Sequence, residues 1–151
     1  MSFDARLEEL GLVLPAPPMM GGNYVSAKTV GQMVYLSGVI SMEAGVVIAG
    51  TLGLDRTVEE GYAAARACAL TQLAVLRKHL GTLDALAEVV SVNGYVHAVA
   101  AFTEPPKVIN GFSDLIVEVF GEAGRHVRAA IGVISLPRNA LVEVQMSVRI
   151  V

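Results

Sequence analysis

Hydrophobic positions recur along the chain with two different periods. Over Thr57–Leu80 the apolar residues follow one another at spacings of three and four, which predicts an amphipathic helix. Thr57 and Glu60 form a capping-box pair at its start, and Gly81 supplies a left-handed stop. A second helix is expected over about Pro106–Phe120. Its buried stripe would consist of Val108, Phe112, Leu115, Ile116 and Val119.

Five stretches rich in β-branched and apolar residues are typical of strands. They are Val30–Ser37, Gly45–Ala49, Val89–Val99, Val127–Ile134 and Leu141–Ile150. The last two, joined by SLPRNA, would form an antiparallel hairpin. With the helices, the order ββ-α-β-α-ββ predicts an α+β two-layer sandwich, in which both long helices cover one face of a mixed sheet.

Residues 1–22 are expected to form an N-terminal extension of this sandwich. A short helix is expected at Phe3–Leu10, with Ser2 as its N-cap and Gly11 at its end. The next stretch, LVLPAPPMMGGNY, carries three Pro and two Gly and cannot hold a regular element. No repeat or linker interrupts the chain, so we expect a single domain over residues 1–151, with residues 1–22 as the extension.

Composition changes this picture in one respect. Of the 151 residues, 54% are hydrophobic and only 17% are charged, against a typical charged share of about 25%. This balance excludes intrinsic disorder. It also leaves too few charges to cover a lone globule, so we expect a homo-oligomer with an apolar interface.

The charge pattern excludes several partners and locations. A net charge of -3 with scattered Lys and Arg argues against nucleic-acid binding, as do only four Phe, four Tyr and no Trp. No apolar stretch reaches the roughly 20 residues of a membrane span. The acidic N-terminus does not resemble a signal peptide, so a cytoplasmic location is expected.

The sequence offers no metal site. The three His show no zinc spacing with each other or with Cys68, the single cysteine. Cys68 lies among alanines and is interpreted as a small buried hydrophobe.

Alternation along the last two strands singles out two charged residues. Glu143 would point away from the helices, opposite the apolar series Val142–Ile150. In the strand before it, Val127, Ala129, Ile131 and Val133 would face the core, and Arg128, Ala130 and Gly132 would face away. Arg128 beside small residues leaves room for a small-molecule pocket. The alternative is that both charges are merely solvated or form a weak salt bridge.

Several segments together resemble a known family. These are VYLSGVIS, the long Ala-rich helix, and GFSDLIVEVFGEAGRHVRAAIGVISLPRNALVEV. They are similar to the Rid family (reactive intermediate deaminases, also called YjgF-like or endoribonuclease L-PSP proteins), from about Asn23 to the C-terminus. The closing pattern is the most specific: Arg, a small pair, Leu-Pro, then a hydrophobic-Glu-hydrophobic strand. The N-terminal helix and PPKVINGFSDL indicate the longer branch of the family.

The resemblance implies both an architecture and a reaction. It implies a chorismate-mutase-like subunit that assembles as a homotrimer around a central barrel, with ligand clefts between subunits. It also implies hydrolysis of enamine and imine intermediates, such as 2-aminoacrylate and 2-iminopropionate, to 2-keto acids and ammonia. No metal or organic cofactor is implied, and the partner is a small carboxylate.

The resemblance also implies roles for particular residues. Arg128 falls on the carboxylate-binding arginine, whose planar fork suits a carboxylate. Glu143 falls on the glutamate that orients water and accepts its proton. Further cleft positions are Tyr24, Ser37, Gly38 and Asn110. Val39 and Ala130 stand where the family often has Gln and Cys or Ser, so the pocket is expected to be more apolar than usual.

Structural explanations remain open for three of these residues. Tyr24 could pack at an interface, Ser37 could cap a strand, and Asn110 could bond to nearby backbone. In the predicted hairpin, Arg128 would pair near Ser147, leaving Glu143 about 13 Å away along the strand. A pocket completed across a subunit interface is one resolution.

Two other functions remain as alternatives to the deaminase. One is a non-catalytic or regulatory trimer that binds a small carboxylate, although retention of Glu143 favours catalysis. The other is an endoribonuclease, which the acidic charge and the lack of a basic patch make the weakest.

Overall fold

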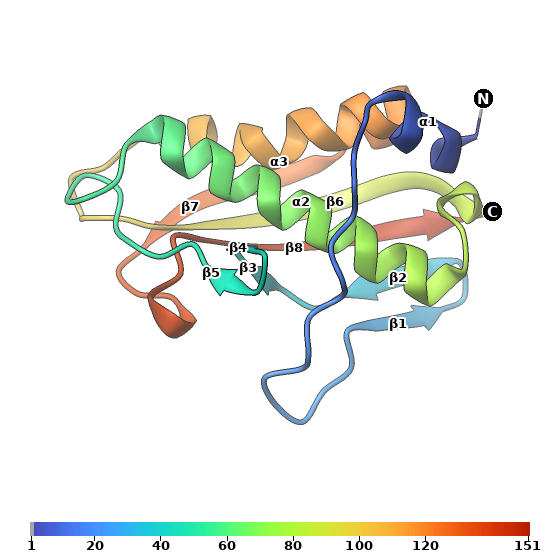
Figure 1. The fold of residues 1–151 in the computed structure, drawn as a ribbon, viewed down its shortest axis with the longest axis horizontal. Helices are drawn as coiled ribbons and strands as arrows, with labels where there is room; N and C mark the ends of the chain where they lie inside the picture. Colours follow the sequence, from blue (N-terminus) through green and yellow to red (C-terminus); the bar gives the residue numbers. More distant parts are fainter. Residues whose placement is uncertain (1) are drawn as a thin grey trace.

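The computed structural model describes residues 2–151 and confirms an α+β unit in which two long helices lie on one face of a mixed sheet (Figure 1). The helices are α1 (Phe3–Glu9), α2 (Val58–Leu80) and α3 (Pro105–Phe120). The sheet contains β1 (Ala27–Val30), β2 (Met33–Leu36), β3 (Val39–Ile40), β6 (Leu86–His97), β7 (Val127–Val133) and β8 (Val142–Ile150). A separate small hairpin pairs β4 (Met42–Glu43) with β5 (Val46–Val47). Short 3-10 turns occur at η1 (Leu83–Ala85), η2 (Gly121–Gly124) and η3 (Pro137–Asn139).

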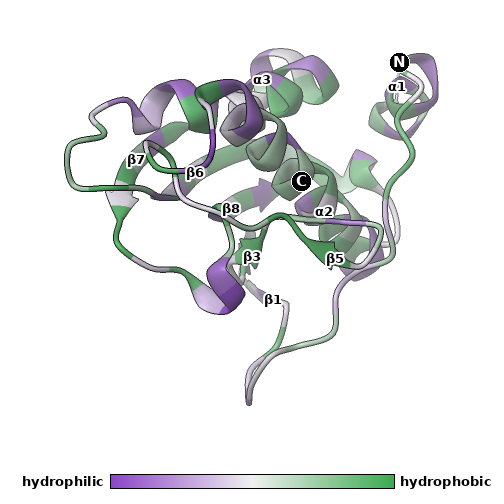
Figure 2. Ribbon diagram, turned by 60° about the vertical axis from the view of Figure 1, so that its left-hand side comes forward, coloured by the Kyte–Doolittle hydropathy of each residue, from purple (hydrophilic) through white to green (hydrophobic). Residues whose placement is uncertain are grey.

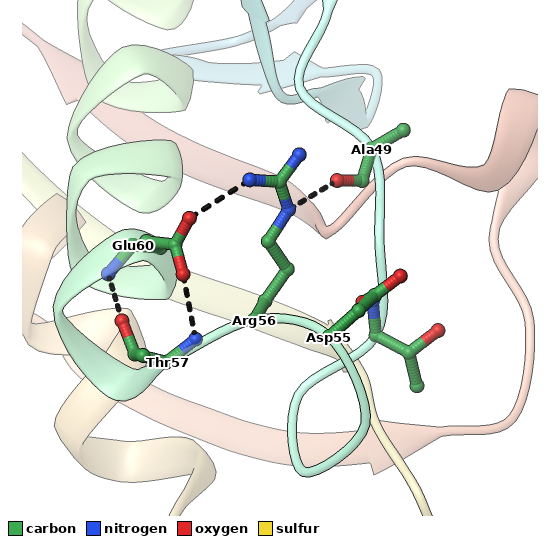
Figure 3. Close-up of polar contacts among 6 residues, drawn as sticks. Ala49, Asp55, Arg56, Thr57 and Glu60 are labelled. Atoms are coloured by element: carbon green, nitrogen blue, oxygen red, sulfur yellow. Dashed lines mark hydrogen bonds and ion pairs between the residues drawn. The ribbon is translucent and has the colours of Figure 1, made fainter.

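Helix α2 begins and ends where the sequence predicts. The Thr57 side chain accepts from the Glu60 N–H, the Glu60 carboxylate accepts from the Thr57 N–H, and Gly81 ends the helix with φ 83°. Arg56 joins this cap to the preceding loop, because its Nη1 donates to Glu60 at 2.8 Å and its Nε to the Ala49 carbonyl at 2.9 Å (Figure 3). In both long helices the predicted apolar stripe is the more buried side, and Cys68 is fully buried.

The strand predicted over Val30–Ser37 is instead part of a hairpin. Val30 pairs with Met33, so β1 and β2 are joined by a two-residue turn at Gly31 and Gln32. Gly31 has φ 61°, a conformation that glycine adopts without steric cost. Before this hairpin, the chain forms α1 as predicted. Residues 12–26 then cross α2 without regular structure, and this segment is called the strap (Figure 1).

The predicted hairpin between the last two strands is wrong. The strand order is β1-β2-β8-β6-β7, with β3 also paired to β8, so β6 separates β7 from β8. β7 runs parallel to β6, and the other pairs in this sheet are antiparallel. The reason is α3, which returns the chain to the same end of the sheet, as a crossover between parallel strands requires. β8, which is apolar at alternate residues, therefore lies in the middle of the sheet, between β2 and β6.

The predicted facing of β7 is also wrong. Val127 is 71% exposed and Ile131 50% exposed, whereas Arg128 and Ala130 point into the helix layer. Ala130 lies beside Gly94 of β6, where a Cβ would come within 2.6 Å of Ile109 of α3. Only small residues fit under α3 at the level of Gly94 and Ala130, so the large apolar side chains of Val127 and Ile131 lie on the open face.

The facing predicted for the last strand is confirmed. Val142, Val144, Met146 and Val148 are buried beneath the helices, and Glu143 and Gln145 lie on the other face. Hydrophobic residues also lie along β3 and β5 (Figure 2), and Val39 of β3 belongs to the buried core. Within residues 2–151, no helix has both the length and the apolar character needed to cross a membrane.

Helices α2 and α3 approach each other closely at Gly111. A Cβ there would lie 2.0 Å from the Tyr62 carbonyl oxygen, which is backbone and cannot move aside. We therefore expect Gly111→Ala to lower the free energy of unfolding by about 3 kcal/mol or more, because α3 would have to separate from α2. Urea unfolding followed by circular dichroism measures this loss.

Gly21→Ala is the matched control for this substitution. A Cβ at Gly21 meets only the Tyr24 hydroxyl, at 3.9 Å, so its stability should stay close to that of the unmodified protein. Equal stability of the two variants would contradict the close helix contact.

Candidate functional site

The central strand β8 changes partner at Ser37 and Gly38. Tyr35 of β2 pairs with Ser147, and Val39 of β3 pairs with Val144. The chain takes one more step from Tyr35 to Val39 than β8 takes between their partners, which is the signature of a β-bulge. The bulge opens the hydrogen-bonding ladder at its middle.

Gln72 of α2 forms hydrogen bonds to the strands on both sides of this opening, from the side of the sheet that the helices cover. Its buried Nε2 donates to the Ser37 carbonyl at 2.9 Å and to the Val144 carbonyl at 3.0 Å, and so bridges the two separated strands. Sequence reasoning missed Gln72, although a glutamine within an apolar helix stripe is a recognisable signal. The predicted site position Ser37 is therefore fixed by a side chain 35 residues away.

Ser37 also ties the Gly-rich loop to the sheet. Its Oγ donates to the Val25 carbonyl at 2.7 Å, and its N–H donates to the Ser26 carbonyl at 2.9 Å. These bonds agree with the strand-end role that was the structural alternative for Ser37. They also hold the neighbouring Tyr24, which is 51% exposed, at the same end of the sheet.

Gly38 provides the surface on which the Glu143 carboxylate lies. A Cβ at Gly38 would be 2.7 Å from Glu143 Oε2, so only glycine leaves room for the carboxylate in this position. Burial raises the pKa of Glu143. Burial also raises the pKa of the Cys68 thiol beneath the sheet, with a smaller contribution from Glu143. Cys68 is therefore an inert core residue and Glu143 a carboxylate made more basic.

One cavity collects these groups. It has a volume of about 680 Å³ and is lined by Tyr24, Ser37, Gly38 and Glu143 together with residues of the strap and of η3. Its apolar walls include Met19, Met20, Val39, Ile40 and Met42. Val39, which stands where the family often has Gln, is one of these apolar residues.

Arg138 also lines this cavity, and nothing in the sequence pointed to it. It has φ 56° and the following Asn139 has φ 59°, a left-handed conformation that residues other than glycine rarely adopt. The tight η3 turn thus brings a guanidinium to the cavity that contains Glu143.

The other predicted residues lie elsewhere. Arg128 Nη1 donates to Ser113 Oγ at 3.0 Å and its Nη2 to the Pro106 carbonyl at 3.1 Å, both on α3. Ala130 lies beside Arg128 on the same side of β7, and Asn110 is exposed on α3. Arg128 and Glu143 are consequently on opposite faces of the sheet, and one chain does not bring them together.

The raised pKa of Glu143 predicts a pH-dependent effect on stability. A carboxyl whose pKa is higher in the folded than in the unfolded protein destabilises the fold when ionised. Glu143→Gln should therefore raise the free energy of unfolding at neutral pH, by less than about 1 kcal/mol for a group that is only half-buried. The gain should disappear as the pH falls below the ordinary value of 4.5.

Urea unfolding at several pH values measures this effect. Glu43→Gln removes the same charge from an exposed residue and controls for the change in net charge. A Glu143→Gln variant that is less stable than the parent at neutral pH would contradict the assigned environment.

Comparison with known proteins places the whole chain in a family. Residues 4–150 match the family described as "YjgF/chorismate_mutase-like, putative endoribonuclease". Protein TCP17 from Trypanosoma cruzi is 45% identical over 148 residues, which cover 97% of this chain and 92% of that protein.

Solved structures agree with this assignment. A Shewanella oneidensis MR-1 crystal structure, named as a "putative endoribonuclease", is 34% identical with a TM-score of 0.95 and coverage of 99% of this chain and 100% of that one. RidA from an Antarctic Psychrobacter is 25% identical with a TM-score of 0.63, over 89% and 94% of the two chains. The expected resemblance is confirmed: the chain belongs to the YjgF/chorismate-mutase-like family, and is a Rid/YjgF-like protein.

Proposed function

We propose that neighbouring copies of this chain form a shared site that hydrolyses enamine and imine intermediates to 2-keto acids and ammonia. One observation carries the proposal: Arg128 and the Glu143 cavity lie on opposite faces of one sheet. A small imino acid can meet both groups only if each comes from a different copy. The Arg128 half of one copy would then cover the Glu143 cavity of the next.

The two halves suit different parts of such a substrate. Arg128 has three N–H groups beyond the two already bonded to α3, enough to hold a carboxylate through two parallel hydrogen bonds. Glu143 would take a proton from a water molecule as its oxygen attacks the C=N carbon. Glu143 would return that proton to the imine nitrogen, which gives a neutral carbinolamine. The carbinolamine hydroxyl proton then moves to the amino group, the C–N bond breaks, and ammonia leaves as the C=O bond of the 2-keto acid forms. The reaction consumes only substrate and water.

The open face of the sheet supports assembly as a homotrimer. Val127 and Ile131 of β7 and Tyr35 of β2 are 71%, 50% and 47% exposed on it. Apolar residues that collect on one sheet face favour contact with another copy. This agrees with the low charged share of 17%. We expect the trimer to act in the cytoplasm, where enzymes that release such intermediates work.

An endoribonuclease activity, which the names of relatives suggest, has less support. The residues lining the cavity include one carboxylate, Glu143, and only one cation, Arg138, among several apolar residues, and the chain carries a net charge of -3. A site for RNA would need cations to hold phosphates.

Single substitutions test the roles of the two residues. Release of 2-keto acid from freshly generated 2-aminoacrylate is measured. Arg128→Lys should raise KM by about tenfold or more, because lysine cannot form the paired hydrogen bonds to a carboxylate. Glu143→Gln should lower kcat by about a hundredfold, since an amide accepts no proton. No acceleration by the unmodified, folded protein would instead favour a carboxylate-binding trimer, detectable by thermal stabilisation with pyruvate.

Mixing two inactive variants tests the shared site directly. Arg128→Ala and Glu143→Gln chains that are unfolded and refolded together should regain about a quarter of the parental activity, because random assembly pairs an intact Arg128 with an intact Glu143 at that frequency. Each variant refolded alone is the control. No recovery in mixed oligomers, verified by their mass, would show that both residues act within one copy.

A further inference from the structure

Arg128 stands at one end of a continuous chain of hydrogen bonds. Its Nη1 donates to Ser113 Oγ at 3.0 Å, and Ser113 Oγ lies 2.8 Å from His126 Nε2. On the other side of the ring, His126 Nδ1 lies 2.7 Å from the Gly124 carbonyl oxygen. The chain connects β7, α3 and the end of η2, and it lies outside the Glu143 cavity.

The two ends determine the direction of every bond in this chain. An arginine can only donate, so Ser113 accepts from Arg128 and its hydroxyl proton is free to point to His126. The Gly124 carbonyl can only accept, so His126 carries its proton on Nδ1. Nε2 is then the bare nitrogen that accepts from Ser113. One tautomer of a neutral His126 therefore satisfies all three contacts.

The surroundings favour that neutral ring. Burial lowers the pKa of His126, and the nearby Arg128 charge lowers it further, while the bond to Gly124 acts in the opposite direction. Asp114 and Arg125 line the same hollow, and Arg125 is bonded to Glu122. A protonated His126 would place a second positive charge next to Arg128, so the neutral ring is favoured.

The backbone around Gly124 is built for this contact. A Cβ at Gly124 would lie 2.6 Å from the Ile116 carbonyl oxygen of α3, so only glycine lets the η2 turn lie against the helix. This approach places the Gly124 carbonyl where the His126 ring can reach it. The far end of the chain is consequently anchored to the same helix that carries Ser113.

We propose that Ser113 and His126 are positioning residues that hold the Arg128 guanidinium ready for the substrate carboxylate. The inference rests on the proposed function, because it names what orients the arginine of that site. The Pro106 carbonyl holds Nη2, and the Ser113–His126 pair holds Nη1. The guanidinium plane is thereby fixed at two points, and its unused N–H groups remain for a carboxylate.

A serine beside a histidine also suggests a nucleophile, but the contacts of Ser113 favour positioning. Its oxygen already accepts a hydrogen bond from Arg128, and that arginine is itself committed to α3. Labelling of Ser113 by a fluorophosphonate would therefore contradict the positioning role.

Three variants test the proposal by steady-state kinetics. Ser113→Ala should raise KM for the imino acid by about tenfold and change kcat by less than about twofold, because Arg128 binds substrate but performs no step. Ser113→Thr keeps the hydroxyl and should restore most of the affinity. Thr29→Ala is the matched control, since it removes a 2.7 Å bond between a hydroxyl and His79 Nε2 away from the site, and should leave both constants unchanged.

A second measurement does not depend on turnover. Nitrogen-15 NMR of the histidine rings should show His126 neutral with its proton on Nδ1, and calorimetry should show weaker pyruvate binding in Ser113→Ala than in Thr29→Ala. If the His126 tautomer and the weaker pyruvate binding are both observed but no turnover is detected, the positioning role is supported and the deaminase reaction is contradicted. Weaker binding in Arg128→Ala alone, or a His126 proton on Nε2, would overturn the positioning role.

Discussion

Helix α3 lies unusually close to its neighbours, and this close packing dictates where the surrounding strands and side chains can lie. Gly111 lets α3 touch the backbone of α2, Gly94 lets it lie directly on β6, and Gly124 lets the next turn fold back against it. Helix and sheet surfaces normally stay apart by the thickness of their side chains. Where glycines remove that layer, the neighbouring strand must also be small on the helix side.

This constraint determines where Arg128 lies. On the side of β7 that faces α3, Ala130 is small, and the long Arg128 side chain reaches Ser113 and Pro106 of α3. Its guanidinium then bonds to polar atoms of α3 and stays partly exposed. The open face receives Val127 and Ile131, which become available for contact with another copy.

A second local feature builds the opposite half of the candidate site. The bulge at Ser37 and Gly38 would leave strand carbonyls without partners, and the Gln72 amide satisfies two of them. The same bulge makes room for the Glu143 carboxylate. Because the two halves lie on opposite faces of one sheet, a shared site between copies follows from the fold and not from any single residue.

Much of the local structure could be predicted from the sequence, because its causes are local. The capping box of α2, the Gly81 stop, the buried stripe of α3 and the alternation of β8 all depend on residues within a few positions of one another. The order of the strands depends on how α3 carries the chain between them, and the alternation of β7 depends on Gly94, which is distant in sequence. Both were predicted wrongly for that reason.

The chemistry divides in the same way. Periodicity in the sequence specifies the fold class, and sequence motifs that resemble the family specify the family and the two candidate charged residues, Arg128 and Glu143. The packed fold places the two residues on opposite faces of the sheet, sets Gln72 against the bulge, and links Arg128 through Ser113 to His126. Those relations join residues on different elements, and only packing brings such residues together.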